Sequence, residues 1–175
     1  MESIATRPTG VKWGLIMAAG LIVFGLLQHF TNTLFNETLS YLSYLITGGA
    51  IFMGLREYKG LNGDSMTLGE GIKVGMWASL VGGVLGSLYS LVFMTFIRPT
   101  FLEETLAFAR EKLEENPQMT EEVIDQTMNL TASFTTPTMI VIMGIVGSLI
   151  GGLVISLILS AIMKAERPVD LDEIG

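Results

Sequence analysis

Two uncharged stretches decide the fold of this chain: GMWASLVGGVLGSLYSLVFMTFI, from Gly75 to Ile97, and MIVIMGIVGSLIGGLVISLILSAIM, from Met139 to Met163. Each is longer than the roughly 20 residues that an α-helix needs to cross a bilayer. Small residues recur in both at every fourth position, which places them along one face of a helix. Such faces let two backbones approach closely in lipid, where no hydrophobic force drives helices together. The two stretches therefore predict a pair of packed transmembrane helices.

The small residues are the main candidate site of the sequence, as a helix-packing surface. They are Gly75, Ala78, Ser79, Gly82, Gly83, Gly86 and Ser90 in the first stretch and Gly144, Gly147, Ser148, Gly151, Gly152 and Ser156 in the second. Paired glycines near mid-membrane leave another interpretation open, in which a helix unwinds into a binding site as it does in some carriers. Close packing explains the glycines without any ligand, and we prefer it. The sequence does not say whether these faces meet within one chain or between chains.

Composition points to the same class of protein. Half of the 175 residues are hydrophobic and only 15% are charged, against about 25% charged in a typical soluble protein. The chain has no cysteine, which excludes disulfides and thiolate chemistry. Its net charge of -7 comes without any basic stripe, so we expect no nucleic-acid partner. We predict an all-α, polytopic membrane protein in which residues 1–175 form a single membrane domain.

Four transmembrane helices are expected, at about 11–30, 39–55, 73–97 and 138–164. The first could be a signal peptide, but no Ala-x-Ala-like cleavage site follows it, and we expect it to be retained. The charged run Arg56 to Lys59 is expected to stop the second helix. A capping box at Thr67-Leu68-Gly69-Glu70 predicts that the third helix begins near Leu68, before the membrane.

Residues 98–137 are expected to leave the bilayer as an acidic excursion. Within it we predict an amphipathic helical hairpin at about 100–133, opened by a second capping box at Thr100-Phe101-Leu102-Glu103 and interrupted at Asn116-Pro117. The apolar stripes are Leu102, Leu106, Ala109 and Leu113 on the first helix and Val123, Ile124, Thr127 and Leu130 on the second. A disordered acidic loop is the alternative, although the apolar periodicity exceeds what disorder requires.

Basic residues set the predicted orientation. Lys and Arg number two before the first helix, none in the first link, three in the second link and three over the long excursion. Because positive charge is retained in the cytoplasm, we expect both termini there, with the hairpin outside the cell and an acidic cytoplasmic tail at 165–175.

The sequence also leaves open whether the two helix pairs arose by an internal duplication. Val11-Lys12-Trp13-Gly14 and Ile72-Lys73-Val74-Gly75 share the pattern apolar, Lys, apolar, Gly at the start of the first and third helices. Two duplicated hairpins would be parallel repeats about an axis along the membrane normal. Chance similarity between apolar helices is the other explanation.

The link between the second and third helices resembles a known family. Its residues are Gly54-Leu55-Arg56-Glu57-Tyr58-Lys59, then Asn62-Gly63, then Met66-Thr67-Leu68-Gly69-Glu70-Gly71-Ile72-Lys73-Val74-Gly75. They are similar to those of a bacterial family of small four-helix membrane proteins called domain of unknown function 4199. The resemblance covers nearly the whole chain and implies a bacterial inner-membrane, multi-pass protein, but it brings no catalytic residues with it.

No catalytic constellation emerges from the residues themselves. His29 is the single histidine, without metal-ligand partners at a suitable spacing. The interiors of the four spans lack the charged groups that proton-coupled and ion-coupled carriers use. We therefore expect no enzyme, metal site or cofactor, and favour a structural or interaction subunit that self-associates or accompanies a membrane-protein partner. The alternative is a small transporter or channel, acting as an oligomer, whose path is lined by Ser79, Ser87, Ser90, Ser148 and Ser156.

Overall fold

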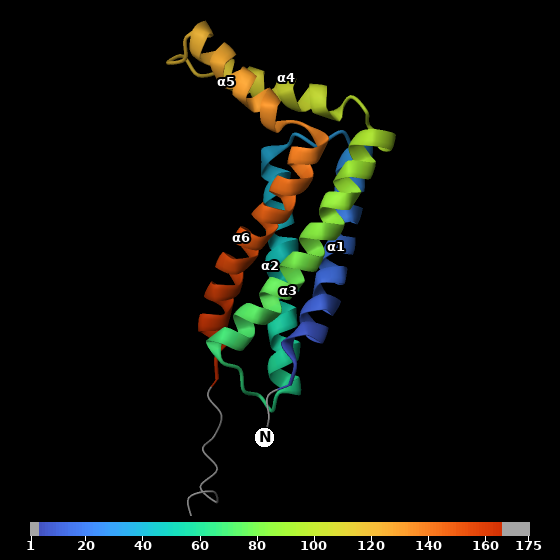
Figure 1. The fold of residues 1–175 in the computed structure, drawn as a ribbon, viewed down its shortest axis with the longest axis vertical. Helices are drawn as coiled ribbons and strands as arrows, with labels where there is room; N and C mark the ends of the chain where they lie inside the picture. Colours follow the sequence, from blue (N-terminus) through green and yellow to red (C-terminus); the bar gives the residue numbers. More distant parts are fainter. Residues whose placement is uncertain (1–3, 166–175) are drawn as a thin grey trace, which may run out of the picture. The chain divides into compact units, whose positions relative to one another are not determined.

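The structure of the protein is a computed structural model that describes residues 4–165. These residues fold into helices, as the sequence predicts (Figure 1). In this part of the chain the α-helices are α1 (Thr6–Phe30), α2 (Glu37–Leu61), α3 (Leu68–Val92), α4 (Phe101–Glu114), α5 (Glu121–Phe134) and α6 (Pro137–Met163), and a π-helical turn η1 (Phe93–Ile97) extends α3. Four helices are long and apolar enough to cross a membrane: α1, α2, α3 with its π-helical turn, and α6. The predicted acidic tail falls, from residue 166 on, outside the described residues.

The chain divides into two compact units. The first contains residues up to 83 and those from 147 onward, and the second contains residues 84–146. Both α3 and α6 therefore contribute one part to each unit.

Within the first unit, α1 and α2 run antiparallel, because Gly54 lies against Trp13 and Gly20 lies against Ile46. The core of this unit is a buried cluster from α2, α3 and the link between them, packed against partly buried side chains of α6. Its members are Ile51, Leu55, Tyr58, Met66, Val74 and Ala78, with Ile155, Leu159 and Met163 packed against them.

The second helix continues past the point where we predicted its end. Arg56, Glu57 and Lys59 are good helix formers, so charge takes the chain out of an apolar environment without breaking the helix. The helix ends at Leu61, and the turn that follows holds Gly63 at φ +68° and Asp64 at φ +56°. Glycine adopts this backbone region without strain, which is why the Asn-Gly pair predicts the turn correctly.

The capping box before α3 forms as predicted. Glu70 accepts hydrogen bonds from the Thr67 amide at 2.8 Å and from its hydroxyl at 2.9 Å, while the Glu70 amide donates to Thr67 Oγ1 at 3.2 Å. Immediately before this cap, Met66 pairs with Ala165 through two backbone hydrogen bonds, so the start of α3 is tied to the residues that follow α6.

The second unit contains the predicted helical hairpin, α4 and α5. The second capping box is wrong: Thr100 has a helical backbone (φ -77°, ψ -4°) and makes no side-chain hydrogen bond to the amides of α4. Its hydroxyl donates instead to Glu104 at 2.6 Å, and Arg98 forms an ion pair with the same carboxylate at 2.7 Å. The carboxylate that closes this turn therefore belongs to Glu104 rather than to Glu103.

The apolar face of α5 also differs from the predicted one. Ile124 is buried, but Val123 is 45% exposed and Leu130 is 65% exposed. The half-buried positions one and two turns beyond Ile124 are Thr127, which the predicted stripe includes, and Met128 and Thr131, which it does not. The Thr131 hydroxyl donates to the carbonyl of Thr127, so it can be partly buried without leaving its hydrogen-bonding capacity unmet. Arg110 of α4 reaches Asp125 of α5 at 3.2 Å and links the two helices.

Candidate functional site

The contact of α3 with α6 in the first unit follows a regular pattern, in which a glycine of one helix faces a serine of the other. Gly71 and Gly75 of α3 lie against Ser160 and Ser156 of α6, and a Cβ atom on either glycine would overlap the facing serine side chain. One turn further along, the roles reverse, and Ser79 of α3 lies against Gly152 of α6. Each step of four residues along α3 is matched by a step of four back along α6. The two helices are therefore antiparallel and in a fixed register.

The serine hydroxyls in this contact serve the backbone. Ser156 donates to the carbonyl of Gly152 on its own helix, and Ser148 donates across the contact to the carbonyl of Ser79 at 2.7 Å. In the first unit the hydroxyl oxygens of Ser79 and Ser160 are buried and have no partner within the described residues. Because serine is small, each serine side chain fits against the facing glycine. A larger residue at either position would force the two backbones apart.

The second unit repeats the arrangement. A Cβ atom on Gly144 of α6 would lie 2.7 Å from Oγ of Ser87 on α3. Ser87 is 5% exposed, and Ser90 is half-buried. Gly86 lies beside this contact, where a Cβ would meet nothing within 4 Å.

A separate line of small residues on α3 packs against α1. A Cβ on Gly14 would lie 2.7 Å from the carbonyl oxygen of Ala78, and one on Gly82 would overlap the end of the Met17 side chain. The contacts advance in the same direction along both helices, so α1 and α3 are parallel. In the first unit α3 therefore uses two faces, one for α6 and one for α1.

Our sequence analysis missed the partner residues on α1. Gly10 and Gly14 are both buried, and Ala18 is 2% exposed. They follow the same spacing of four that identified the face on α3, so the signal was present in the sequence.

Two of the predicted packing residues lie on the outside of α6. Gly147 and Gly151 are exposed, and a Cβ on either would meet nothing within 4 Å. Gly152, the immediate neighbour of Gly151, is buried against α3. The small residues of α6 thus form two faces, one used within the chain and one open.

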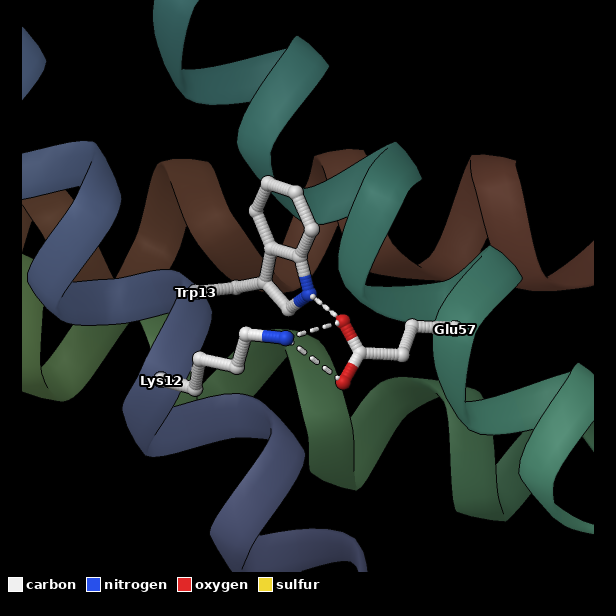
Figure 2. A network of polar contacts seen from close by, with 3 residues as sticks. All are labelled: Lys12, Trp13 and Glu57. Atoms are coloured by element: carbon white, nitrogen blue, oxygen red, sulfur yellow. Dashed lines mark hydrogen bonds and ion pairs between the residues drawn. The ribbon is translucent and has the colours of Figure 1, made fainter.

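A polar cluster joins α1 to α2 (Figure 2). Lys12 approaches both carboxylate oxygens of Glu57 at 2.8 and 2.9 Å, and the indole Nε1 of Trp13 donates to one of them at 2.8 Å. The carboxylate is therefore held by three hydrogen bonds from two neighbouring residues. Such an arrangement fixes the relative rotation of two helices, and it leaves Glu57 poorly placed to accept a proton from a substrate.

No group of three or more His, Cys, Asp or Glu side chains between residues 4 and 165 is arranged to hold a metal ion. The single histidine, His29, lies in the last turn of α1 beside the ring of Phe30.

Four long apolar helices, packed in the first unit through residues without bulky side chains, are the features of a multi-pass helical membrane protein. The chain belongs to the family described as "Protein of unknown function (DUF4199)", whose model matches residues 12–165. The resemblance drawn from the link before α3 is thereby confirmed. No curated protein and no solved structure matches the chain.

Proposed function

We propose that this protein is a non-catalytic structural or interaction subunit of the bacterial inner membrane that associates with a second copy of itself through α6. The observation that carries the proposal is the contrast between the two small-residue faces of that helix. One face is filled by α3 of the same chain, while Gly147 and Gly151 are left open.

The open face has the properties of a transmembrane contact surface. Gly147 and Gly151 are four residues apart, and the next positions on that side, Val154 and Ile158, are 53% and 52% exposed. Only 11% of the most apolar window of α6 is buried, against 22% to 28% in the other three long helices. Since glycines at this spacing allow close backbone approach in lipid, the face suits a second α6 from another copy, with a different membrane protein as the other occupant.

Cysteine cross-linking tests the proposal sharply, because the natural chain contains no cysteine. Val154→Cys places a thiol on the open face, and Leu153→Cys places one at almost the same membrane depth but about 100° around the helix. Both positions are exposed within one chain. We expect disulfide-linked dimers from Val154→Cys and few from Leu153→Cys in native membranes.

Adding Gly151→Leu should abolish the cross-link from Val154→Cys. A Cβ at residue 151 would have open space around it within the chain. Unchanged circular dichroism of the Gly151→Leu variant in mild detergent checks that the subunit remains folded. Equal cross-linking from both cysteines, or a cross-link that survives Gly151→Leu, would remove the proposed interface.

We also propose the orientation in which both termini lie in the cytoplasm and the α4–α5 hairpin lies outside it. The distribution of basic residues supports it: the end of α2 carries Arg56 and Lys59 and the start of α3 carries Lys73, while residues 98–137 carry eight acids and three bases. In intact cells, an impermeant maleimide should label a cysteine placed at Asn116 in the hairpin and spare one placed at Gly60, an exposed position at the end of α2 where a Cβ would meet nothing within 4 Å. The reverse labelling would overturn the orientation.

A serine-lined path receives no support from the geometry. Ser79 and Ser156 are fully buried, and Ser87 is 5% exposed, each against a glycine of the facing helix. Ser148 is engaged with a backbone carbonyl. We therefore do not carry the channel or transporter forward as a second candidate.

A further inference from the structure

Gly10 of α1 allows a close approach between the N-terminal parts of α1 and α3 in the first unit. A Cβ on Gly10 would lie 2.5 Å from the Cβ of Trp77 and 2.7 Å from the carbonyl oxygen of Val74. Because α1 and α3 are parallel, this contact places Arg7, one turn before Gly10, above Trp77. The carbon at the centre of the Arg7 guanidinium lies 5.2 Å from the centroid of the Trp77 ring, a cation–π contact.

A second cation lies on the same side of α3. Lys73 precedes Trp77 by four residues, so it occupies the same face one turn closer to the start of the helix. Arg7 and Lys73 are both exposed. Arg7 therefore lies over the Trp77 ring, and Lys73 lies one turn before Trp77 on the same face of α3.

No ion pair joins either cation to a carboxylate of residues 4–165, a property that they share with Arg56, Lys59 and Lys164. Of these five, Arg7 is the one that lies over a tryptophan ring. Lys12 pairs with Glu57, while Arg98, Arg110 and Lys112 each have a glutamate within 3.1 Å. Glu70, one turn before Lys73, turns its carboxylate to the helix cap. An anion on this face of α3 would be attracted by both positive charges.

We propose that Arg7 and Lys73 bind the phosphate of an anionic phospholipid, with Trp77 at the level of the glycerol esters. The position favours a lipid over a free phosphate ion. Tryptophan prefers the interface between headgroups and acyl chains, and α3 continues from Trp77 into an uncharged stretch that acyl chains can cover. Basic residues beside a membrane span attract anionic lipids in the same way.

The charge of the first unit is consistent with this assignment. Arg56, Lys59 and Lys164 lie at the C-terminal ends of α2 and α6, which is the same end of the first unit as Arg7 and Lys73, since α2 and α6 run against α1 and α3. Residues 28–48, at the other end of α1 and α2, contain no Lys or Arg. Only one end of this unit can therefore hold an anionic headgroup through basic side chains.

Fluorescence quenching tests the site directly. The chain has two tryptophans, so Trp13→Phe leaves Trp77 as the single emitter. The full-length variant is reconstituted into phosphatidylcholine vesicles that contain either brominated phosphatidylglycerol or brominated phosphatidylcholine at the same fraction. We expect Trp77 to be quenched more strongly by the brominated anionic lipid, because bromine quenches only at close range.

Charge-removing variants locate the preference. Arg7→Gln and Lys73→Gln should each reduce the relative affinity for phosphatidylglycerol on the order of fivefold, the effect of one basic residue near an anionic membrane. Lys59→Gln and Lys164→Gln remove the same charge elsewhere at this end and should leave the preference almost unchanged. Inorganic phosphate added to the vesicles should not compete.

Three results would overturn the proposal. Equal quenching by the two brominated lipids would show that no anionic headgroup is bound beside Trp77. An equal loss in all four variants would show a diffuse effect of net charge rather than a site. Competition by inorganic phosphate would show an ion site in place of a lipid site.

Discussion

Ser79 of α3 lies directly against the backbone of Gly152 of α6, and its side chain fills the space where a Cβ of residue 152 would be. Two turns toward the start of α3 the same contact is made with the residue types exchanged, Gly71 on α3 and Ser160 on α6. The contact thus depends on one glycine and one serine at each step, and either helix can supply either residue. Substitutions at these positions can therefore separate the effect of helix packing on stability from the effect of helix propensity.

The neighbouring glycines Gly151 and Gly152 should respond oppositely to alanine. Gly151→Ala meets nothing within 4 Å and replaces a poor helix former, so we expect unchanged or slightly raised stability, by at most about 1 kcal/mol. Gly152→Ala brings the same gain in propensity but overlaps Ser79, and overpacking of this kind costs roughly 1–3 kcal/mol. Unfolding in mild detergent, followed by circular dichroism, measures both. Equal stabilities of the two variants would contradict the packing of α3 on α6.

Exchanging the two residues of one contact should restore what the single change removes. Gly152→Ser alone would place two serines against each other, and we expect it to destabilise the protein. Adding Ser79→Gly recreates the arrangement seen at Gly71 and Ser160, so the double variant should recover most of the loss. A double-mutant cycle should give a coupling free energy of about 0.5–3 kcal/mol, as found for residues in contact. Additive effects would show that the pair does not interact.

In the helical hairpin, Ile124 should matter and Leu130 should not. Ile124 is 6% exposed and Leu130 is 65% exposed, although both belong to the apolar stripe predicted from the sequence. Truncating a buried isoleucine to alanine costs roughly 2–5 kcal/mol. Ile124→Ala should therefore speed hydrogen exchange throughout α4 and α5, measured by mass spectrometry. Leu130→Ala is the matched control, and the opposite ranking would mean that α5 packs through its other face.

The cluster of Lys12, Trp13 and Glu57 should show that the carboxylate matters more than the ion pair. Lys12 is 56% exposed at its side chain, and an exposed pair of this kind contributes about 0–1 kcal/mol, so Lys12→Ala should have little effect. Glu57→Ala also removes the acceptor of the partly buried Trp13 indole, a loss that costs about 1–3 kcal/mol.

Tryptophan emission reports on the same cluster. With Trp77→Phe in the background, the emission maximum of Trp13 should shift in Glu57→Ala and stay in place in Lys12→Ala. A larger effect from Lys12→Ala on stability or on emission would show that the ion pair, rather than the indole hydrogen bond, holds α1 to α2.

Local features of the sequence predicted the helices well. The Thr67 cap, the Asn62-Gly63 turn and the interruption at Asn116-Pro117 depend on neighbouring residues, and each occurs where expected. The second capping box failed because Arg98 and Thr100 both engage Glu104, a choice that the four-residue pattern does not contain. The apolar face of α5 was predicted correctly at Ile124 and Thr127 and wrongly at Val123 and Leu130, because Thr131, whose hydroxyl bonds to its own helix, is partly buried where Leu130 was expected.

By itself, the sequence determined that four helices are apolar enough to cross a membrane and that α3 and α6 carry faces of small residues, because hydropathy and spacing are properties of one segment at a time. Only the tertiary structure decided which of those residues are inside. Gly151 and Gly152 are identical and adjacent, yet about 100° of helix rotation leaves one open and presses the other against Ser79. The rotation of each helix is set by all of its neighbours together, including the glycines of α1 and the hydrogen bonds of Glu57, and no single stretch of sequence contains that information.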